Sequence, residues 1–271
     1  MFWIICAALT AVVAIAVAAP LMRRGSGTEA PAAAYDLRVY RDQLREVGRD
    51  LERRLIEPAE AERLRTEIGR KVLEDNDAES APEFCYKFPG ATCISVNRVV
   101  AHGIPDATPL RDGDLVNIDV SAELDGFFAD TGASFVVGTA SAAQQRLLDA
   151  TREARDAAIA QLRAGELLSG IGRTIETVAA RRGFRIIRNL QSHGVGRALH
   201  EAPGSIPGYF DRRDTRRLHD GMVITVEPFL ATHATRTEDL DDGWSLICPK
   251  GYGAQFEHTV VVTRGAPIIV T

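Results

Sequence analysis

The sequence has few cysteines and no excess of basic residues. Its four cysteines, Cys6, Cys85, Cys93 and Cys248, form no C-x-x-C pair. This spacing excludes a zinc knuckle and a disulfide framework, and it favours a reducing compartment. The 32 lysines and arginines are fewer than the 37 aspartates and glutamates, which gives a net charge of −5. Because nucleic-acid binding needs clustered basic residues, we expect no direct contact with nucleic acid.

What the chain does contain is typical of a globular enzyme. It has 271 residues, of which 45% are hydrophobic and 25% are charged. This composition is sufficient to bury a core. The length fits one large domain or two small ones.

The N-terminal segment contains one long uncharged run, FWIICAALTAVVAIAVAAPLM. Its length of about 21 residues meets the ~20 residues that a helix needs to cross a bilayer. A secretory signal peptide is the alternative, but such peptides begin with basic residues, and here Arg23 and Arg24 follow the run instead. We therefore expect a membrane anchor at residues 1–22, with its basic flank in the cytoplasm. The predicted location is the bacterial inner membrane, crossed once, with the rest of the chain in the cytoplasm.

After the anchor, residues 23–34 are predicted to be a small-residue linker and residues 35–75 an αα-hairpin. One helix face carries apolar residues at 3-4-3-4 spacing, namely Leu37, Tyr40, Leu44, Val47 and Leu51. Pro58 suits the first turn of the second helix. Both apolar stripes are narrow, so the two helices either pack only on each other or dock on a partner helix.

The hairpin and the apolar run before it resemble the N-terminal region of c-type cytochrome biogenesis proteins that serve as haem-lyase accessory subunits. The matching run is AYDLRVYRDQLREVGRDLERRLIEPAEAERLRTEIGRKVL, and the resemblance covers about residues 1–75. It implies a membrane anchor followed by a cytoplasmic helical stretch. It contributes no catalytic residue.

The remainder of the chain is predicted to be a linker at residues 76–83 and a catalytic domain at residues 84–271. Strands rich in Val and Ile are expected within 91–104, 114–138, 221–230 and 254–263. Amphipathic helices are expected at 141–163, capped by Ser141, and at 167–182. The order of strands, two helices and then strands favours the α+β class with a mainly antiparallel sheet.

Acidic residues recur inside the predicted strands. They are Asp119, Asp130, Glu227 and Glu257, each flanked by apolar residues. Buried carboxylates without partners are costly, so four of them need a common explanation, and a divalent metal that neutralises them is the most economical. Carboxylates with an imidazole suit Mn²⁺, Fe²⁺, Co²⁺ or Zn²⁺, and the absence of cysteine ligands argues against a structural zinc site. Two metals with bridging carboxylates would use four acids and one histidine.

The stretch QSHGVGRALHEAP contains His193 and His200, seven residues apart. Histidines near glycines are common in loops, where the imidazole packs in the core. The residues of this stretch alone leave open whether both histidines, one or neither bind a metal.

Five motifs taken together resemble type I methionine aminopeptidases. They are VAHGIPD, VNIDVSAELDGFFADT, SHGVGRALHEAP, ITVEPF and QFEHT, and the resemblance covers about residues 84–271. It implies the pita-bread (creatinase/aminopeptidase-like) fold and two divalent cations per chain (Co²⁺, Mn²⁺, Fe²⁺ or Zn²⁺). The implied reaction removes the initiator methionine from nascent chains whose second residue is small. It also implies nascent polypeptide N-termini at the ribosome as partners, and we expect a monomer.

The resemblance also implies a role for each motif residue. Asp119 would bind one metal, Asp130 and Glu257 would bridge both, and His193 and Glu227 would bind the other. His102 and His200 match the two substrate-side histidines, with Glu227 as proton shuttle. Residues that match the methionine pocket are Phe88, Cys93 and Trp244.

The chain departs from this family upstream of residue 84, where the cytochrome-biogenesis-like segment replaces the expected helices, so an N-terminally truncated domain is expected. Three interpretations follow. The chain is a natural membrane-tethered enzyme, or a gene-fusion or reading-frame artefact that truncates the enzyme and leaves it cytoplasmic, or a tethered protein of cytochrome c biogenesis with an inactive hydrolase half. A further variant places the hairpin at 35–75 where the missing helices would lie. Within the same fold, a prolidase-type or Xaa-Pro aminopeptidase is the enzymatic alternative.

Overall fold

The computed structural model describes residues 77–271 and, before them, residues 43, 46, 47, 49, 50, 53, 55 and 71. The predicted anchor at 1–22, the linker at 23–34 and most of the hairpin at 35–75 lie outside the described residues. In the part of the chain that is described, no helix has the length and apolar character needed to span a membrane.

Residues 77–271 contain three helices and fifteen strands. The helices are α4 (Ala81–Tyr86), α5 (Ala142–Ala160) and α6 (Ser169–Arg182). The first strands are β1 (Ala78–Ser80), β2 (Cys93–Val96), β3 (Val99–Ala101), β4 (Leu115–Leu124), β5 (Phe127–Val136), β6 (Arg185–Ile186), β7 (Gln191–Gly194) and β8 (Glu201–Pro207). The remaining strands are β9 (Val223–Val226), β10 (Phe229–Ala231), β11 (Glu238–Asp239), β12 (Leu246–Ile247), β13 (Gly253–Gln255), β14 (His258–Val261) and β15 (Ile268–Ile269).

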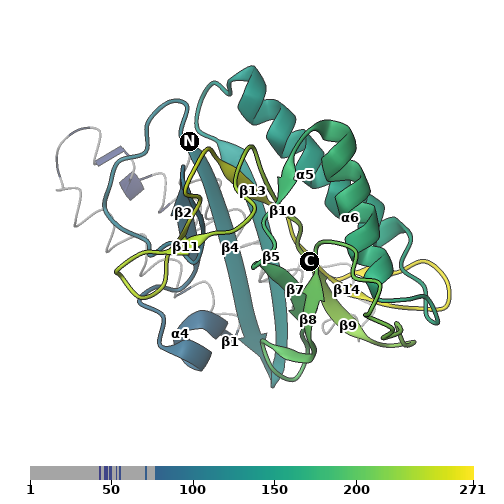
Figure 1. Cartoon of the computed structure of the whole chain (residues 1–271). Helices are drawn as coiled ribbons and strands as arrows, with labels where there is room; N and C mark the ends of the chain where they lie inside the picture. Colours follow the sequence, from purple (N-terminus) through teal and green to yellow (C-terminus); the bar gives the residue numbers. More distant parts are fainter. Residues whose placement is uncertain are drawn as a thin grey trace, which may run out of the picture.

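The long hairpin of β4 and β5 runs through the molecule (Figure 1). Asp125 and Gly126 join its strands with φ of +53° and +78°. Two positive φ values suit a tight hairpin turn, which an Asp-Gly pair adopts readily. β4 also pairs with β1 and β2, so four strands form one sheet.

A second sheet of five strands has the order β15-β14-β9-β7-β8. Two three-stranded sheets, β13-β10-β6 and β11-β12-β3, complete the strand layers. Every strand pairing in the described residues is antiparallel. The predicted α+β class with a mainly antiparallel sheet is therefore confirmed.

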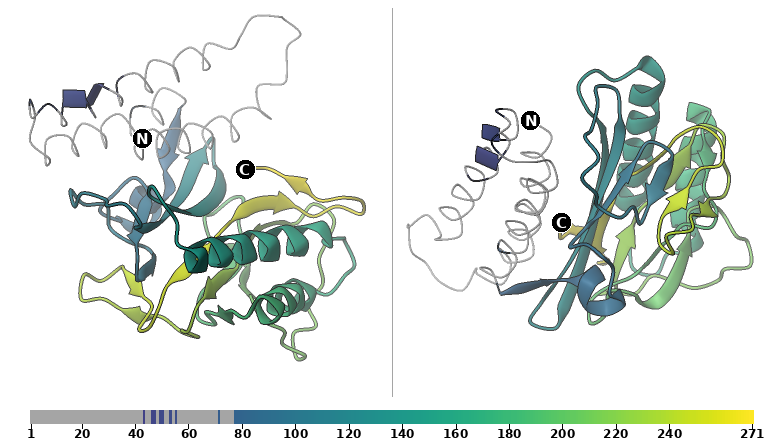
Figure 2. Two further views of the ribbon diagram at one scale, coloured as in Figure 1. Left: turned by 90° about the horizontal axis from the view of Figure 1, so that it is seen from above. Right: turned by 90° about the vertical axis from the view of Figure 1, so that its left-hand side faces the viewer.

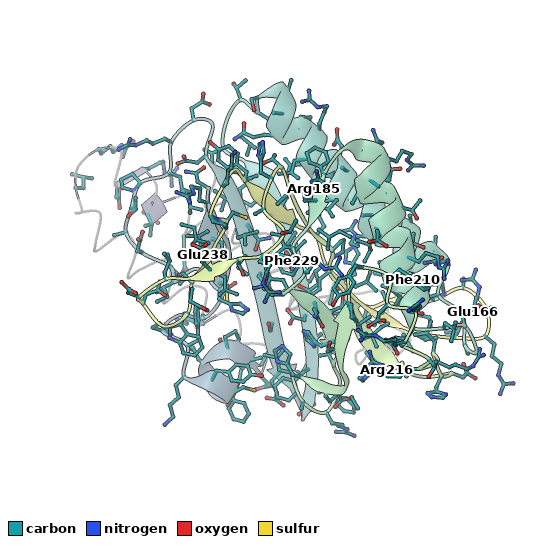
Figure 3. All side chains as sticks on the ribbon, in the orientation of Figure 1. Glu166, Arg185, Phe210, Arg216, Phe229 and Glu238 are labelled. Atoms are coloured by element: carbon teal, nitrogen blue, oxygen red, sulfur yellow. The ribbon has the colours of Figure 1, made fainter. Side chains whose placement is uncertain are left out.

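Helices α5 and α6 lie side by side against one face of the strands (Figure 2). Ser141 caps α5 through a reciprocal capping box with Gln144, as its place before the apolar periodicity predicts. The buried residues between helices and strands form the main core, and they include Leu147, Ile171, Ile175, Ile224, Leu230 and Val260. Phe229 lies in the interior, whereas Glu166 and Arg216 are exposed at the periphery (Figure 3).

The segment predicted as a linker at residues 76–83 differs in the structure. Residues 78–80 form β1, in register with Leu124 to Ala122 of β4, and α4 begins at Ala81. Ser80 is the N-cap of α4 and accepts a hydrogen bond from the backbone N–H of Glu83. The polar composition of this segment thus reflects a helix cap and a half-buried strand.

Candidate metal centre

The residues predicted to bind metal come from different strands. Asp119 lies on β4, Asp130 on β5 and His193 on β7, while Glu227 directly follows β9 and Glu257 lies between β13 and β14. Asp130 is opposite Ser121 in the β4–β5 register, and Asp119 is opposite Gly132. Because side chains two residues apart share a face of a strand, both aspartates point to the same side of the hairpin.

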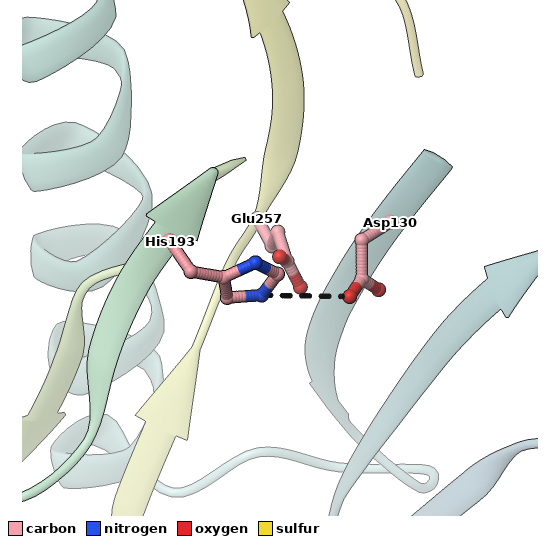
Figure 4. Close-up of side chains that lie close together, drawn as sticks. All are labelled: Asp130, His193 and Glu257. Atoms are coloured by element: carbon pink, nitrogen blue, oxygen red, sulfur yellow. Dashed lines mark ion pairs between the residues drawn. The ribbon is translucent and has the colours of Figure 1, made fainter. Parts of the chain in front are cut away.

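The side chains of these residues converge. His193 Nε2 lies 3.8 Å from Asp130 Oδ2 and 3.5 Å from Glu227 Oε1. One ligand atom from each of Asp130, His193 and Glu257 lies within 4.8 Å of the others, and Figure 4 shows these three side chains facing one another. The buried carboxyl groups of Asp119 and Asp130 are close enough to affect each other's pKa. The residues that the sequence places far apart therefore form one cluster.

The electrostatics of the cluster favour a bound positive charge. Burial raises the pKa of Asp119, Glu227 and Glu257 well above the ordinary range, and neighbouring carboxylates raise each pKa further. Burial also raises the pKa of Asp130, although Ser121 donates a hydrogen bond to its carboxylate. Glu257 Oε1 is buried and has no hydrogen-bond partner among the described residues. This donor set, with one buried oxygen left unpaired, fits divalent cations.

Neighbouring side chains orient the candidate ligands. Thr225 Oγ1 donates to Glu227 Oε1 at 2.8 Å, and Gln255 Nε2 donates to Glu257 Oε2 at 2.8 Å. Asn117 Nδ2 in turn donates to Gln255 Oε1 at 2.7 Å. His193 Nδ1 lies 3.0 Å from the carbonyl oxygen of Gly194, which leaves Nε2 with a free lone pair toward the carboxylates.

A cavity of about 480 Å³ opens beside the cluster. Its lining includes nearly all of the predicted site residues, namely Phe88, Cys93, His102, Asp119, Asp130, His193, His200, Glu227 and Trp244. Glu257 does not line the cavity because it lies beneath it, with 1% of its surface exposed.

One wall of the cavity is apolar. The rings of Phe88 and Trp244 meet edge to face with their centroids 5.3 Å apart. Cys93 is buried opposite Asp119 in the β2–β4 register. Burial raises the pKa of the Cys93 thiol well above its ordinary value, so this side chain stays neutral and adds a small, polarizable surface.

The two histidines outside the predicted ligand set also reach the cavity. The His200 ring lies 4.0 Å from the His193 ring, centroid to centroid, and its Nδ1 is 2.6 Å from Tyr86 Oη. His102 follows β3 with φ of +53°. Both side chains are partly exposed at the cavity. Desolvation by the surrounding protein lowers the pKa of His102, and it lowers the pKa of His200 to about 4, so the neutral form is favoured at physiological pH.

Sequence reasoning missed three residues of this region. Gln255 orients Glu257, and Asn117 orients Gln255. Asn117 could have been found from the sequence, because it lies two residues from Asp119 and therefore on the same face of the strand. Tyr86 contacts His200 across 114 positions of sequence, and no local pattern predicts such a contact.

Comparisons with known proteins show which family this chain resembles. The sequence pattern of metallopeptidase family M24 matches residues 43–264. Methionine aminopeptidase 2 of Bacillus subtilis (strain 168) is 46% identical over 206 residues, which are 75% of this chain and 83% of the relative. A methionine aminopeptidase of Staphylococcus epidermidis (strain ATCC 12228) is 42% identical over 236 residues, covering 84% of this chain and 94% of the relative.

Solved structures share the fold. Methionine aminopeptidase from Rickettsia prowazekii superposes with a TM-score of 0.73 at 33% identity, covering 88% of this chain and 97% of that chain. Prolidase from Pyrococcus furiosus superposes with a TM-score of 0.60 at 24% identity, covering 78% of this chain and 55% of that chain, which shows a shared fold. The predicted pita-bread fold is confirmed by these neighbours.

The family match begins at residue 43, inside the predicted hairpin, and not at the predicted domain start at residue 84. The methionine aminopeptidases of Staphylococcus epidermidis and Rickettsia prowazekii are covered over 94% and 97% of their lengths, respectively. These matches therefore give no support to a domain that lacks its N-terminal part. The match takes in 222 of the 271 residues, counted from 43 to 264 inclusive. The chain belongs to metallopeptidase family M24.

Proposed function

We propose that the chain removes the initiator methionine from nascent proteins whose second residue is small. The observation that carries this proposal is the convergence of four carboxylates and His193 beside an apolar cavity wall. The wall formed by Phe88, Cys93 and Trp244 suits a methionine side chain. The methionine aminopeptidases similar to this chain support the same reaction.

Two divalent cations, Co²⁺, Mn²⁺, Fe²⁺ or Zn²⁺, would supply Lewis-acid activation of the peptide carbonyl and lower the pKa of the attacking water. Asp130 and Glu257 would hold both cations, Asp119 one of them, and His193 with Glu227 the other. The hydrogen bonds from Thr225 and Gln255 keep Glu227 and Glu257 in place for this task.

The remaining polar groups act on the substrate. His200, neutral at physiological pH, donates a hydrogen bond to the carbonyl oxygen of the scissile bond, where negative charge develops. His102 contacts the scissile amide nitrogen. Glu227 accepts the proton of the attacking water and delivers it to the leaving amine.

The test is methionine release by the full chain loaded with Mn²⁺ or Co²⁺. We expect release from a Met-Ala peptide, and loss of release in His193→Ala with reduced metal content. His200→Ala should keep its metal and lose turnover. Equal metal loss in both variants would contradict the assigned roles, and no release by the metal-loaded wild type would refute the reaction.

A prolidase-type or Xaa-Pro aminopeptidase activity is the second candidate, because prolidase shares the fold. Met-Ala and Ala-Pro peptides compared at equal concentrations separate the two. Faster hydrolysis of Ala-Pro would favour the second candidate. The cavity wall of Phe88 and Trp244 favours the longer methionine side chain.

For partners, we propose that nascent N-termini reach the cavity at the ribosome, and that the enzyme acts as a monomer. Co-sedimentation with ribosomes that carry stalled nascent chains tests the first part. Light scattering of the full chain tests the second. Equally strong binding of the enzyme to ribosomes that carry no nascent chain would show that the contact is with the ribosome and not with the nascent N-terminus.

For the N-terminus, we propose that residues 1–22 anchor the chain in the inner membrane, with the catalytic part on its cytoplasmic side. The uncharged run and the following Arg23 and Arg24 support this location. The resemblance of residues 1–75 to cytochrome biogenesis proteins also supports it. A role as an interaction protein with an inactive hydrolase half is disfavoured by the complete ligand set.

We further propose that residues 43–76 supply the N-terminal part of the family domain, because the family match begins at residue 43. The mass and metal content of the native protein, taken separately from membrane and soluble fractions, test both proposals. A soluble, active form that lacks residues 1–22 would contradict the anchor. Full activity of residues 77–271 alone would contradict a requirement for residues 43–76.

A further inference from the structure

Tyr86 is the last residue of α4 and is not part of the set that the family resemblance identifies. Its Oη lies 2.6 Å from Nδ1 of His200, and the two ring centroids are 5.8 Å apart at an interplanar angle of 57°. Tyr86 also lines the cavity. This hydrogen bond therefore joins α4 to the substrate side of the site.

The position of Tyr86 is fixed from its own side. α4 begins at the Ser80 cap and ends at Lys87, whose φ of +58° turns the chain sharply. The backbone N–H of Lys87 donates to Glu83 and that of Phe88 donates to Pro82. The Phe84 ring lies 6.5 Å from the ring of Phe128 on β5, centroid to centroid. The helix is thereby held against β5.

His200 is fixed from the opposite side. The Arg197 guanidinium lies 3.7 Å above the ring of Phe127, the first residue of β5. The carbonyl of Gly196 accepts a hydrogen bond of 2.7 Å from Phe128 N–H, and Glu201 accepts hydrogen bonds from the N–H groups of Arg197 and Ala198. Both partners of the hydrogen bond are thus held at the start of β5.

The tautomer of His200 is linked to which group donates in this hydrogen bond. A neutral imidazole carries one N–H, and the nitrogen that accepts a hydrogen bond is the one without it. If Tyr86 O–H donates to Nδ1, the proton of His200 sits on Nε2. In the reverse arrangement Nε2 would carry a lone pair and could not donate to a carbonyl oxygen.

We propose that Tyr86 is a positioning residue that holds His200 in the tautomer protonated at Nε2, so that this N–H donates to the carbonyl oxygen of the scissile peptide bond. The inference rests on the proposed aminopeptidase function. It adds to that function a residue whose hydroxyl acts through His200 and does not itself touch the reacting atoms. The hydroxyl sets the direction of one hydrogen bond that becomes stronger as the carbonyl oxygen gains charge.

The kinetic test uses the full Mn²⁺-loaded chain and a double-mutant cycle. Tyr86→Phe keeps the ring and removes the hydroxyl, and we expect kcat for a Met-Ala peptide to fall about three- to tenfold, the range for one net hydrogen bond, with KM and metal content unchanged. In a His200→Ala background the same substitution should leave the residual kcat unchanged. Tyr252→Phe, an exposed tyrosine whose contacts with Thr232 use only its backbone, is the matched control.

The spectroscopic test does not depend on activity. In the ¹⁵N-histidine spectrum of the Zn²⁺-loaded full chain, assigned with His200→Gln, His200 should show the Nε2-protonated tautomer. In Tyr86→Phe the signal should move toward a mixture of tautomers. Thermal melting of each variant reports whether it is folded.

The outcomes separate this proposal from the proposed function. An Nδ1-protonated His200 in the wild type, or an equal fall in kcat from Tyr86→Phe with and without His200, would overturn the positioning role. If Tyr86→Phe does not fold, the wild-type tautomer alone still decides. If the wild type shows the Nε2 tautomer but releases no methionine, the proposed function fails and the assignment of the tautomer stands.

Discussion

At the scale of single residues, Glu257 combines a deeply buried carboxylate with one oxygen that has no hydrogen-bond partner among the described residues. Ionising this group in the metal-free protein is costly, because burial and three neighbouring carboxylates raise its pKa. The same group is favourable when a cation is bound. Glu257 therefore lowers the stability of the metal-free protein and raises the affinity for metal.

We therefore expect Glu257→Gln to stabilise the metal-free protein and to weaken its stabilisation by metal. The metal-free variant should melt at a higher temperature than the metal-free wild type at pH 7.5, because the amide has no charge to desolvate. Added Mn²⁺ should no longer raise its melting temperature. Calorimetry with and without EDTA measures both, and Glu238→Gln on the exposed strand β11 serves as control. A lower melting temperature of the metal-free variant would show that the buried carboxylate does not destabilise the metal-free protein.

Gln255 gives a second prediction at this scale. It is fully buried, donates to Glu257 and accepts from Asn117. Gln255→Met keeps the length and removes both hydrogen bonds, and loss of such a supporting contact weakens metal binding about 10- to 100-fold. Titration calorimetry with Mn²⁺ measures the change. Gln145→Met, which removes an exposed contact to Asp149 on α5, should leave the affinity unchanged.

The residues proposed to bind metal or substrate were predictable to different degrees. The acidic residues in apolar strands indicated a metal, since nothing local neutralises them. The separation of His193 from His200 came from the family resemblance, and the structure adds that the Nε2 of His193 faces two carboxylates. Tyr86 was not predictable, because its contact with His200 depends on how α4 docks on β5.

At the scale of elements, local periodicity predicted the helices and strands that are stabilised by contacts between residues close in sequence. The β4–β5 hairpin has alternating patterns and an Asp-Gly turn, and α5 has a cap followed by a helical stripe. The strands β6, β11, β12 and β15 have two residues each, and their sequences carry no repeat. They are strands only because distant segments pair with them. The residues of β7 are not among the predicted strands, for the same reason.

The cap of α4 provides a prediction at this scale. Ser80 accepts from Glu83 N–H and donates to the carbonyl of Ala91 at 2.9 Å. Ser80→Ala should lower the free energy of unfolding by about 0.5–2 kcal/mol, the usual cost of losing an N-cap. It should also lower kcat, because α4 carries Tyr86.

Ser141→Ala is the matched control for this effect. It removes the cap of α5, which lies away from the cavity. We expect a similar loss of stability by urea unfolding and an unchanged kcat. If both variants lose kcat in proportion to their stability, the link between the α4 cap and catalysis is refuted.

At the scale of the whole molecule, the metal cluster connects separate sheets. Asp119 and Asp130 belong to the sheet of β4 and β5, and His193 belongs to the five-stranded sheet. A cation held by both sets ties these sheets together. Metal that binds only the folded protein adds about 2.7 kcal/mol of stability at a concentration 100 times its Kd.

Removal of the metal should therefore make stability depend on pH in a defined direction. The carboxyl pKa values of Asp119, Glu227 and Glu257 are raised in the fold above their ordinary values of 3.8, 4.5 and 4.5. Below those ordinary values the groups are protonated in both states and their contribution is fully present. As pH rises from the ordinary pKa values toward the raised ones, the unfolded chain loses these protons while the fold retains them. Metal-free stability therefore falls as pH rises.

The histidines act in the opposite direction at lower pH. Burial lowers the pKa of His193 and of His200 below 6.5, so protonation of the unfolded chain reduces stability as pH falls below that value. Melting curves between pH 7.5 and 8.5 thus keep the histidine contribution small, because the imidazoles of the unfolded chain are then largely neutral. We expect the melting temperature of the EDTA-treated full chain to fall over this range, and that of the Mn²⁺-loaded chain to stay level or rise, because metal binding favours ionised carboxylates. Parallel curves for the two forms would show that the cluster does not bind Mn²⁺ through these carboxylates.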